Sequence, residues 1–341
     1  MIAQLAHIKT AYKLRMRRRR LLLRAWRKRK QIKQHSFKAP TFAPQDVLAF
    51  TTLRNEAHRL PYFLSHHRTL GVTHFFIVDN NSDDGSFDYL MDQPDVSVWR
   101  TESSYKLSRF GMDWLTWLMI CYGHGKWCLT LDADELFIYP NWTTRPLPAL
   151  INWLEQTGER SFSAMMLDLY PKGNVGGVVY DPSQSPLSIL EWFDCGNYTQ
   201  IRKPDLQNLW IQGGVRARCF FDQEPERAPT MGKIPLVKWD RRYTYVSSTH
   251  SLLPRMLNHV YDENGGEKTS GILLHTKFLP SIVKKSEEEK IRQEHFANST
   301  LYDSYYDTLT QDPDLWCEYS TRLQSWKQLE ALGLMSKGGW A

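Results

Sequence analysis

The first 45 residues contain no aspartate or glutamate, although they hold 14 lysines and arginines. Residues 46–341 carry 29 basic and 37 acidic side chains, so the net charge of +6 originates in the N-terminal segment. The sequence also has no run of about 18 apolar residues, the length that a transmembrane helix needs. These absences argue against a membrane-spanning helix and predict a basic appendage on an acidic body.

Cysteine is scarce, and its five positions are scattered without a C-x-x-C pair. This spacing predicts neither a disulfide framework nor a zinc site, and it favours a reducing compartment. Aromatic residues are abundant, with 13 Trp, 16 Tyr and 15 Phe. Such a content is typical of a folded enzyme or of a surface that handles carbohydrate, and it argues against disorder.

The basic segment 1–45 has the pattern of an amphipathic helix. Its apolar residues fall near one side of a helical wheel, and lysines and arginines surround them. We predict that this helix lies on an anionic membrane surface, where each cation contributes roughly 1 kcal/mol. A solvated basic arm and a nucleic-acid-binding patch are the alternative interpretations. The predicted apolar stripe consists of Leu14, Leu21, Leu22, Ala25 and Trp26.

From residue 47 onward, short apolar runs alternate with helical patterns. Residues 57–70 repeat apolar side chains at helical spacing, and we expect Gly71 to end that helix. The alternation predicts an α/β fold with a mostly parallel sheet and helices on both faces. The first predicted strands are residues 47–52, 74–78, 96–100 and 127–131.

Three acids follow the last of these strands, at residues 132–135. Asp132 and Asp134 are two positions apart in an extended segment, so their side chains share one face. Two neighbouring carboxylates repel each other unless a proton or a cation lies between them. A divalent ion completed by substrate phosphates is the usual solution, so the segment predicts a metal-diphosphate site. A solvated strand end or helix N-terminus is the structural alternative.

A second polar loop, residues 79–86, follows the strand predicted at 74–78. Asp79 comes directly after four apolar residues, where an unpaired charge is costly. Ser82 to Gly85 by themselves are typical of a helix cap and a turn. Because ligands bind at the carboxyl ends of strands in doubly wound sheets, these loops predict a ligand site at one sheet edge.

Together these motifs resemble those of family 2 type glycosyltransferases, whose GT-A fold is Rossmann-like. The motifs are Arg-Asn-Glu at 54–56, Val-Asp-Asn-Asn-Ser-Asp-Asp-Gly-Ser at 78–86 and Leu-Asp-Ala-Asp-Glu at 131–135. Gln-Gly-Gly-Val-Arg at 212–216 and His-Thr-Lys at 275–277 are similar to the branch found among bacterial surface-polysaccharide gene products.

The resemblance implies a metal-dependent hexosyltransferase (EC 2.4). Such an enzyme moves a sugar from a nucleotide-diphosphate donor, with UDP-sugar favoured, to an acceptor hydroxyl, with inversion, in polysaccharide or glycoconjugate biosynthesis. The predicted parts of the chain are the basic arm 1–45, a nucleotide-sugar-binding half 46–145, an acceptor-binding half 146–280 and a C-terminal helical extension 281–341.

The resemblance also implies which residues bind the nucleotide sugar. Glu56 and Asp79 would face the nucleoside, with Asp83 or Asp84 in support. Lys277 would meet the diphosphate as a point charge.

For the metal, Mn²⁺ or Mg²⁺, the resemblance implies the Asp-x-Asp pair. Asp134 would be the direct ligand, and Asp132 would also contact the nucleotide sugar. His275 would be a further ligand from the second half of the chain, with His250 as the competing choice. A packed histidine is the structural alternative at position 275.

The catalytic base is less clearly marked, because no Glu-Asp pair stands between residues 160 and 250. An acceptor hydroxyl must lose its proton as it attacks, so an Asp or Glu is needed. We predict Asp194 first, because its aromatic neighbours could raise its pKa, and Asp168 second. Each is equally typical of a helix or turn cap.

Three other functions fit parts of the pattern. An Asp-x-Asp phosphohydrolase normally has Thr or Val where Leu136 stands here. A nucleotidyltransferase normally has a Gly-rich loop after the first strand, and residues 54–56 lack it. A non-catalytic glycan-binding or scaffold protein would not need the intact acids.

We expect the protein to lie in the cytoplasm, peripheral to the inner face of the membrane. The expected partners are a nucleotide-sugar donor, a glycan or lipid-linked acceptor and, through the basic arm, an anionic membrane surface. No nucleic-acid partner is expected.

Overall fold

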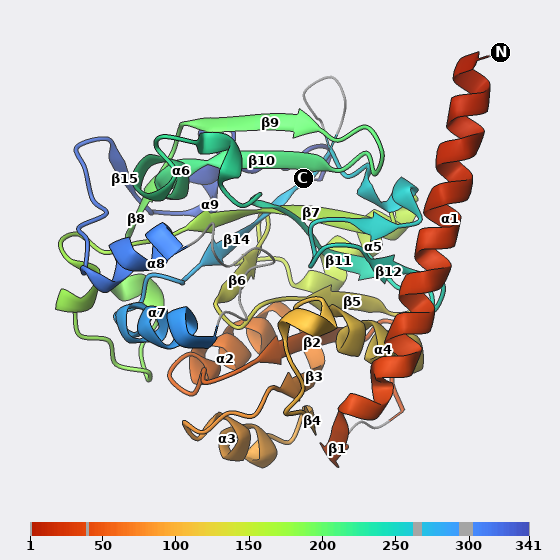
Figure 1. Ribbon diagram of the computed structural model, residues 1–341, viewed down its shortest axis with the longest axis horizontal. Coiled ribbons are helices and arrows are strands. Elements are labelled where there is room, and N and C mark those ends of the chain that lie inside the picture. Colours follow the sequence, from red (N-terminus) through yellow and green to blue (C-terminus); the bar gives the residue numbers. More distant parts are fainter. Residues whose placement is uncertain (1, 39–40, 262–267, 293–302, 341) are drawn as a thin grey trace.

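The computed structural model describes residues 2–38, 41–261, 268–292 and 303–340. Its centre is a nine-stranded sheet with the order β1-β4-β3-β2-β5-β11-β7-β14-β6 (Figure 1). The strands are β1 (Lys33–Ser36), β2 (Val47–Leu53), β3 (Val72–Asp79), β4 (Val96–Arg100), β5 (Trp127–Thr130), β6 (Glu135–Ile138), β7 (Ser161–Asp168), β11 (Gly232–Lys238) and β14 (Gly271–His275).

In the first half of the sheet, strands β2, β3, β4 and β5 are parallel, as the sequence predicts, and edge strand β1 runs antiparallel to β4. Strand β2 pairs in parallel with β3 and β5, and β3 pairs in parallel with β4. All seven residues of β2 are buried, which is typical of a strand covered on both faces. The parallel register brings the carboxyl ends of these strands to one edge of the sheet.

The second half of the sheet is mixed, so the expectation of a mostly parallel sheet holds only in part. Strand β11 runs antiparallel between β5 and β7, and β14 pairs in parallel with β7. At the far edge, β6 runs antiparallel to β14. The chain therefore places β6 beside β14, a strand that comes more than 100 residues later, and local alternation does not reveal this pairing.

Helices cover both faces of the sheet. Successive side chains of β2 point to opposite faces and therefore pack with different helices. Val47 and Ala49 belong to the apolar cluster that includes helix α2, whereas Leu48 and Phe50 belong to the cluster that includes α4. Gly71 ends α2 with a φ of 106°, in agreement with the sequence. The helices are α1 (Ile2–Lys28), α2 (Leu60–Leu70), α3 (Ser86–Asp92), α4 (Met112–Tyr122), α5 (Leu147–Gln156), α6 (Gly214–Phe220), α7 (Ser281–Arg292), α8 (Asp303–Thr310) and α9 (Trp326–Ala331).

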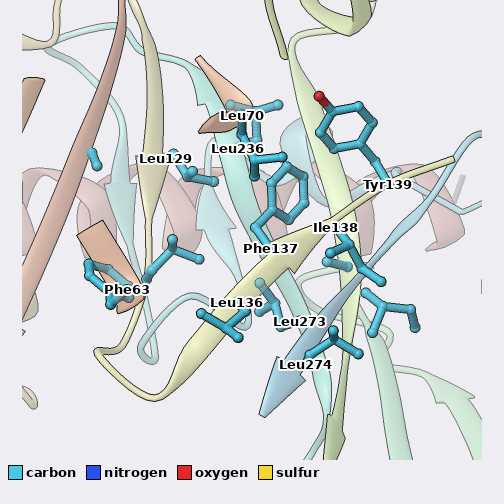
Figure 2. Close-up of a cluster of buried hydrophobic side chains, with 14 of the residues drawn as sticks. Phe63, Leu70, Leu129, Leu136, Phe137, Ile138, Tyr139, Leu236, Leu273 and Leu274 are labelled. Atoms are coloured by element: carbon cyan, nitrogen blue, oxygen red, sulfur yellow. The ribbon is translucent and has the colours of Figure 1, made fainter. Parts of the chain in front are cut away.

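One apolar cluster extends into the second half of the sheet and contains side chains of β6, β14 and β11. Leu136 and Phe137 from β6 lie among Leu273 from β14 and Leu236 from β11 (Figure 2). Three two-stranded sheets accompany the central sheet. They pair β8 (Trp192–Asp194) with β15 (Ser320–Arg322), β9 (Tyr198–Arg202) with β10 (Leu209–Gly213), and β12 (Thr244–Tyr245) with β13 (Leu252–Leu253).

Helix α1 lies along one side of the body, and its N-terminal end extends beyond it (Figure 1). Leu14, Leu21 and Ala25 are buried, so these members of the predicted membrane-facing stripe pack against the protein instead. Trp26 stays 48% exposed. The segment after the helix supplies edge strand β1, which pairs with β4, so residues 33–36 of the basic segment belong to the sheet. Within the described ranges, no helix combines the length and the apolar character needed to cross a bilayer.

Candidate active site

A cavity of about 580 Å³ opens at the edge where the parallel strands end. Its walls come from the segment after β2, the turn between β5 and β6, the end of β14, and helices α6 and α7. A volume of this order suits a ligand of the size of a cofactor or nucleotide.

Charged side chains of both signs line this cavity. Its cations outnumber its acids, and several are deeply buried, which is costly unless they face opposite charge. Aromatic rings of Tyr105, Phe110, Trp210 and Tyr306 complete the lining. The basic residues are Arg54, Arg59, Arg216, Arg227, Lys233, Lys277 and Lys285, and the acids are Glu56, Asp132, Asp134, Glu226 and Glu288.

His275, at the end of β14, lies between two carboxylates. Its Nε2 is 3.0 Å from Asp134 Oδ2, and its Nδ1 is 2.5 Å from Asp168 Oδ1. Burial alone would lower the pKa of His275, but Asp134 and Asp168 raise it above its ordinary value. For Asp134, burial opposes ionisation, yet His275, Arg59 and Lys277 hold its pKa well below the usual range. The structure thus brings together the predicted pair Asp134 and His275.

Arg216 closes the other side of Asp168. Its Nε is 2.7 Å from Asp168 Oδ2, and both side chains are buried. Burial opposes the charge on Asp168, but Arg216 and His275 together lower its pKa. The two glycines of the Gln-Gly-Gly-Val-Arg motif start α6, where φ is 147° at Gly213 and 61° at Gly214. A Cβ at Gly213 would lie 2.0 Å from Asn197 O, so only glycine allows the turn that places Arg216.

Asp132 is paired with a lysine that the sequence did not indicate. Lys233 Nζ is 2.7 Å from Asp132 Oδ2 and also bonds Glu135, which is fully buried. Burial raises the pKa of Glu135 to about 7, although Lys233 opposes this shift. The side chain of Asp132 is 41% exposed and lines the cavity, with one oxygen held by the lysine.

Glu56 lines the cavity as part of a second ionic cluster. Arg59 Nη1 is 2.6 Å from its Oε2, and Lys285 Nζ is 2.7 Å from its Oε1. Burial would raise the pKa of Glu56, but Lys285 and Arg59 leave it lowered. Arg59 also donates to the carbonyls of Thr276 and Lys277, so it ties α2 to the chain after β14.

Asp79, Asp83 and Asp84 do not line the cavity, although Asn80 does. Asp79 is fully buried and lies 3.4 Å from Arg100 Nε, and its Oδ2 accepts the Ser82 N–H. Asp84 accepts hydrogen bonds from the N–H groups of Ala57 and Ser86, and Asp83 is exposed. These residues hold the loop that carries Asn55 and Glu56, and their direct contact with a nucleoside stays a prediction.

Neither residue predicted as the base lines the cavity. Asp194 is held by the Arg218 guanidinium at 2.9 and 3.0 Å and accepts a hydrogen bond from Tyr170. Asp168 is enclosed by Arg216 and His275 as described. Both carboxylates are therefore engaged by buried or half-buried cations, and their assignment as the base is a prediction still to be tested.

Lys277 and His250 both line the cavity. The Lys277 ammonium also lies 5.1 Å from the centre of the Tyr305 ring. Burial, with Lys233 nearby, lowers the pKa of His250 to about 4, and its Nδ1 is 2.8 Å from the Gly232 carbonyl. His250 thus belongs to the wall near Lys233, whereas His275 contacts Asp134.

Four basic residues of the cavity that form ion pairs with acids of the site were given no role from the sequence: Arg59, Arg216, Lys233 and Lys285. Lys233 stands in an apolar strand and Arg59 at the start of an apolar helical stripe, where a charge is unusual. A charged residue within an apolar pattern was thus the sequence signal that could have identified Lys233 and Arg59. Arg216 was noted only as part of a motif, and Lys285 sits in a Lys/Glu-rich segment that gave no signal.

The donor set for a metal is small. Among residues 2–38, 41–261, 268–292 and 303–340, no three His, Cys, Asp or Glu side chains are grouped so that they could hold an ion. The adjacent pair Asp134 and His275 offers one carboxylate oxygen and one imidazole nitrogen. Asp168 contacts Nδ1, the other ring nitrogen. Histidines that bind a metal usually make such a contact to a carboxylate through their second nitrogen.

Known proteins resemble this chain only in part. No protein-family model matches it. A glycosyltransferase family 92 protein of Arabidopsis thaliana is 30% identical over 112 residues, which make up 30% of this chain and 18% of the relative. A glycosyltransferase family 92 protein of Ricinus communis is 30% identical over 103 residues, 28% of this chain and 17% of the relative. The chain thus spans less than a fifth of the length of these two curated relatives.

Proposed function

We propose that this protein is a metal-dependent glycosyltransferase that uses a nucleotide-diphosphate sugar. The observation that carries the proposal is the Asp134–His275–Asp168 arrangement at the wall of a cavity rich in buried cations. The partial similarity to two glycosyltransferase family 92 proteins supports the same class of enzyme. It favours sugar transfer over the phosphohydrolase and glycan-binding alternatives.

The charge of the cavity supports a diphosphate ligand. Arg216 and Lys233 are 6% and 4% exposed, and Lys277 is 8% exposed, so each would act in a site of low dielectric. Cations in such a site stabilise the charge that develops on a departing diphosphate. The aromatic rings of Tyr105 and Trp210 offer flat surfaces for a base or a sugar ring. UDP is the nucleotide that we favour, with GDP and dTDP as competitors.

One carboxylate oxygen and one imidazole nitrogen are the protein donors that we propose for a divalent cation. Asp134 and His275 would hold Mn²⁺ or Mg²⁺, and oxygens of the diphosphate and water would complete its coordination. When bound, such an ion stabilises the leaving diphosphate as a Lewis acid. Asp168 fixes the ring of His275 from behind, and Lys233 limits the freedom of Asp132.

The sheet supports a GT-A-like arrangement. The order β4-β3-β2-β5 with β11 antiparallel to β5 places the Asp-x-Asp turn where the parallel strands end. The acids at 132–134 and the end of β14 face one cavity, as a donor site built from both halves of the chain requires. We propose transfer to an acceptor hydroxyl with inversion, in which a carboxylate takes the proton from that hydroxyl.

A transfer assay tests the proposal. The purified full chain would be incubated with a panel of UDP, GDP and dTDP sugars, and release of nucleoside diphosphate would be followed with and without Mn²⁺. We expect Mn²⁺-dependent release that is lost in Asp134→Asn and retained in Asp92→Asn, an exposed aspartate at the end of α3. Cleavage of phosphomonoesters without turnover of any nucleotide sugar would overturn the proposal.

A further inference from the structure

Helix α1 has two distinct sides. On the inner side, Leu14 and Leu21 form an apolar cluster with Val246 and Leu253. Arg24 Nε lies 2.6 Å from Asp113 Oδ2, a carboxylate that is fully buried. Lys28 donates to the Leu107 carbonyl at 2.7 Å. The helix is therefore fixed to the body through these contacts.

The outer side carries a second apolar stripe. Its residues fall within an arc of roughly 80° on a helix of 3.6 residues per turn. Isolated exposed apolar side chains are ordinary, but five that share one side of one helix indicate an interaction surface. They are Ile8, Tyr12, Met16, Leu23 and Trp26, with exposures of 58%, 65%, 43%, 45% and 48%.

Only basic charge accompanies this stripe. Arg19 lies within the arc, and Arg15, Arg20 and Arg27 lie beside it, all of them exposed. Neither aspartate nor glutamate occurs among residues 1–45. A partner that meets this side must therefore accept apolar side chains and supply negative charge.

We propose that the outer side of α1 binds an anionic lipid bilayer and lies in its interface. A bilayer offers both features that the helix needs, an apolar layer beneath negatively charged headgroups. Nucleic acid supplies the charge but gives no reason for the apolar stripe. Long arginine side chains such as Arg19 can reach the headgroups while their stems stay in apolar surroundings.

The contacts between α1 and the body connect the outer side of this helix to the wall of the cavity. Val246 packs against α1, and the next two residues, Ser247 and Ser248, line the cavity. Arg109 bridges Asp113 and the Tyr245 carbonyl, so the ionic contact of Arg24 continues into the same segment. The bilayer therefore lies on one side of α1 and a wall of the cavity on the other.

Vesicle sedimentation with the full chain tests this inference. The probe would be vesicles of phosphatidylcholine with or without phosphatidylserine. Met16→Glu/Leu23→Glu alters the outer stripe, and Val179→Glu/Tyr319→Glu adds the same charge at two positions on the body that are 91% and 79% exposed. Circular dichroism would confirm that each variant is folded, and Mn²⁺-dependent turnover without vesicles gives an independent readout.

We expect the wild-type protein to bind the anionic vesicles and not to bind the neutral ones. The outer-stripe variant should lose at least about tenfold in the ratio of bound to free protein, because two apolar side chains no longer enter the interface. The control variant should bind like wild type. Equal binding by the two variants, or binding of an RNA oligonucleotide with none to anionic vesicles, would overturn the inference and leave the transfer proposal untouched.

Discussion

Asp168 accepts a hydrogen bond of 2.5 Å from Nδ1 of His275, so the ring presents Nε2 to Asp134 and the cavity. Asp168 is itself held by Arg216 at 2.7 Å. The carboxylate thus fixes the orientation of the imidazole ring, and it keeps a proton on Nδ1. In the proposed metal site, Asp168 would therefore be a positioning residue for His275.

Replacing Asp168 with Asn should weaken Mn²⁺ binding by about 10–100-fold, because the orientation of His275 is lost. Calorimetric titration of Mn²⁺ into the protein in the presence of UDP would measure this. The melting temperature must be recorded too, because the variant leaves Arg216 without its carboxylate partner. If transfer disappears while Mn²⁺ affinity and melting temperature are unchanged, Asp168 is a base and not a positioning residue.

Asp194, the residue predicted first as the base, does not contact His275 and differs in this from Asp168. Its contacts with Arg218 and Tyr170 lie outside the cavity lining, so we expect Asp194→Asn to lower the melting temperature while transfer persists. Glu226 is an exposed acid that does line the cavity, and Glu226→Gln is compared with Asp194→Asn in the same measurements. Loss of transfer in Asp194→Asn with unchanged stability and UDP binding would instead support its role as the base.

Lys233 is predicted to stabilise the fold as well as the site. Lys233→Met leaves Glu135, 0% exposed, without its cation, and breaking a buried pair in this way costs about 3–5 kcal/mol. The double variant Lys233→Met/Glu135→Met removes both charges and should cost less than Lys233→Met alone. Urea denaturation of the two variants measures the difference. Additive losses would show that the two residues are not coupled.

Two buried histidines of α2 should make the fold sensitive to acid. His66 Nε2 bonds the Phe137 carbonyl, and His67 Nε2 accepts the Phe137 N–H. Burial lowers the pKa of His66 to about 4 and that of His67 well below its ordinary value. The unfolded chain, with a histidine pKa of about 6.5, then binds more protons than the folded one. Stability is therefore fully present above pH about 6.5 and falls as the pH drops toward 4, by up to about 1.4 kcal/mol per pH unit for each histidine.

His66→Gln keeps a donor for the Phe137 carbonyl and removes one titrating group. Denaturation between pH 7 and 4.5 should show a shallower loss of stability in this variant than in wild type. His35→Gln, a change at an exposed position, is the control. An unchanged slope in His66→Gln would contradict the assignment of acid sensitivity to this contact.

The sequence predicted the parts of the site that depend on local order. Asp132 and Asp134 follow a buried strand, and the cavity lies where the parallel strands end, because period-two alternation and strand-helix order are local properties. Lys233 escaped notice because its partners stand about 100 positions earlier in the chain. The antiparallel direction of β11 was not predicted for a similar reason, since strand direction depends on how distant segments cross.

Helix α1 shows a different limit. The wheel revealed an apolar side, but a helix with two apolar stripes does not tell which of them meets the protein. Leu14 and Leu21 pack inward because Val246 and Leu253 are there to receive them, and Met16 and Leu23 remain outside. Only the fold decides between the two sides.

Calorimetric titration of UDP into the full chain, with and without Mn²⁺, is the most direct test of the proposed donor site. The arrangement of Asp134 and His275 predicts that binding requires Mn²⁺ and falls at least about tenfold in Asp134→Asn and in His275→Ala. GDP and dTDP titrated in the same way would show whether another base is preferred. If no nucleoside diphosphate binds, or if one binds equally well without Mn²⁺ and in both variants, Asp134 and His275 do not form a metal-diphosphate site.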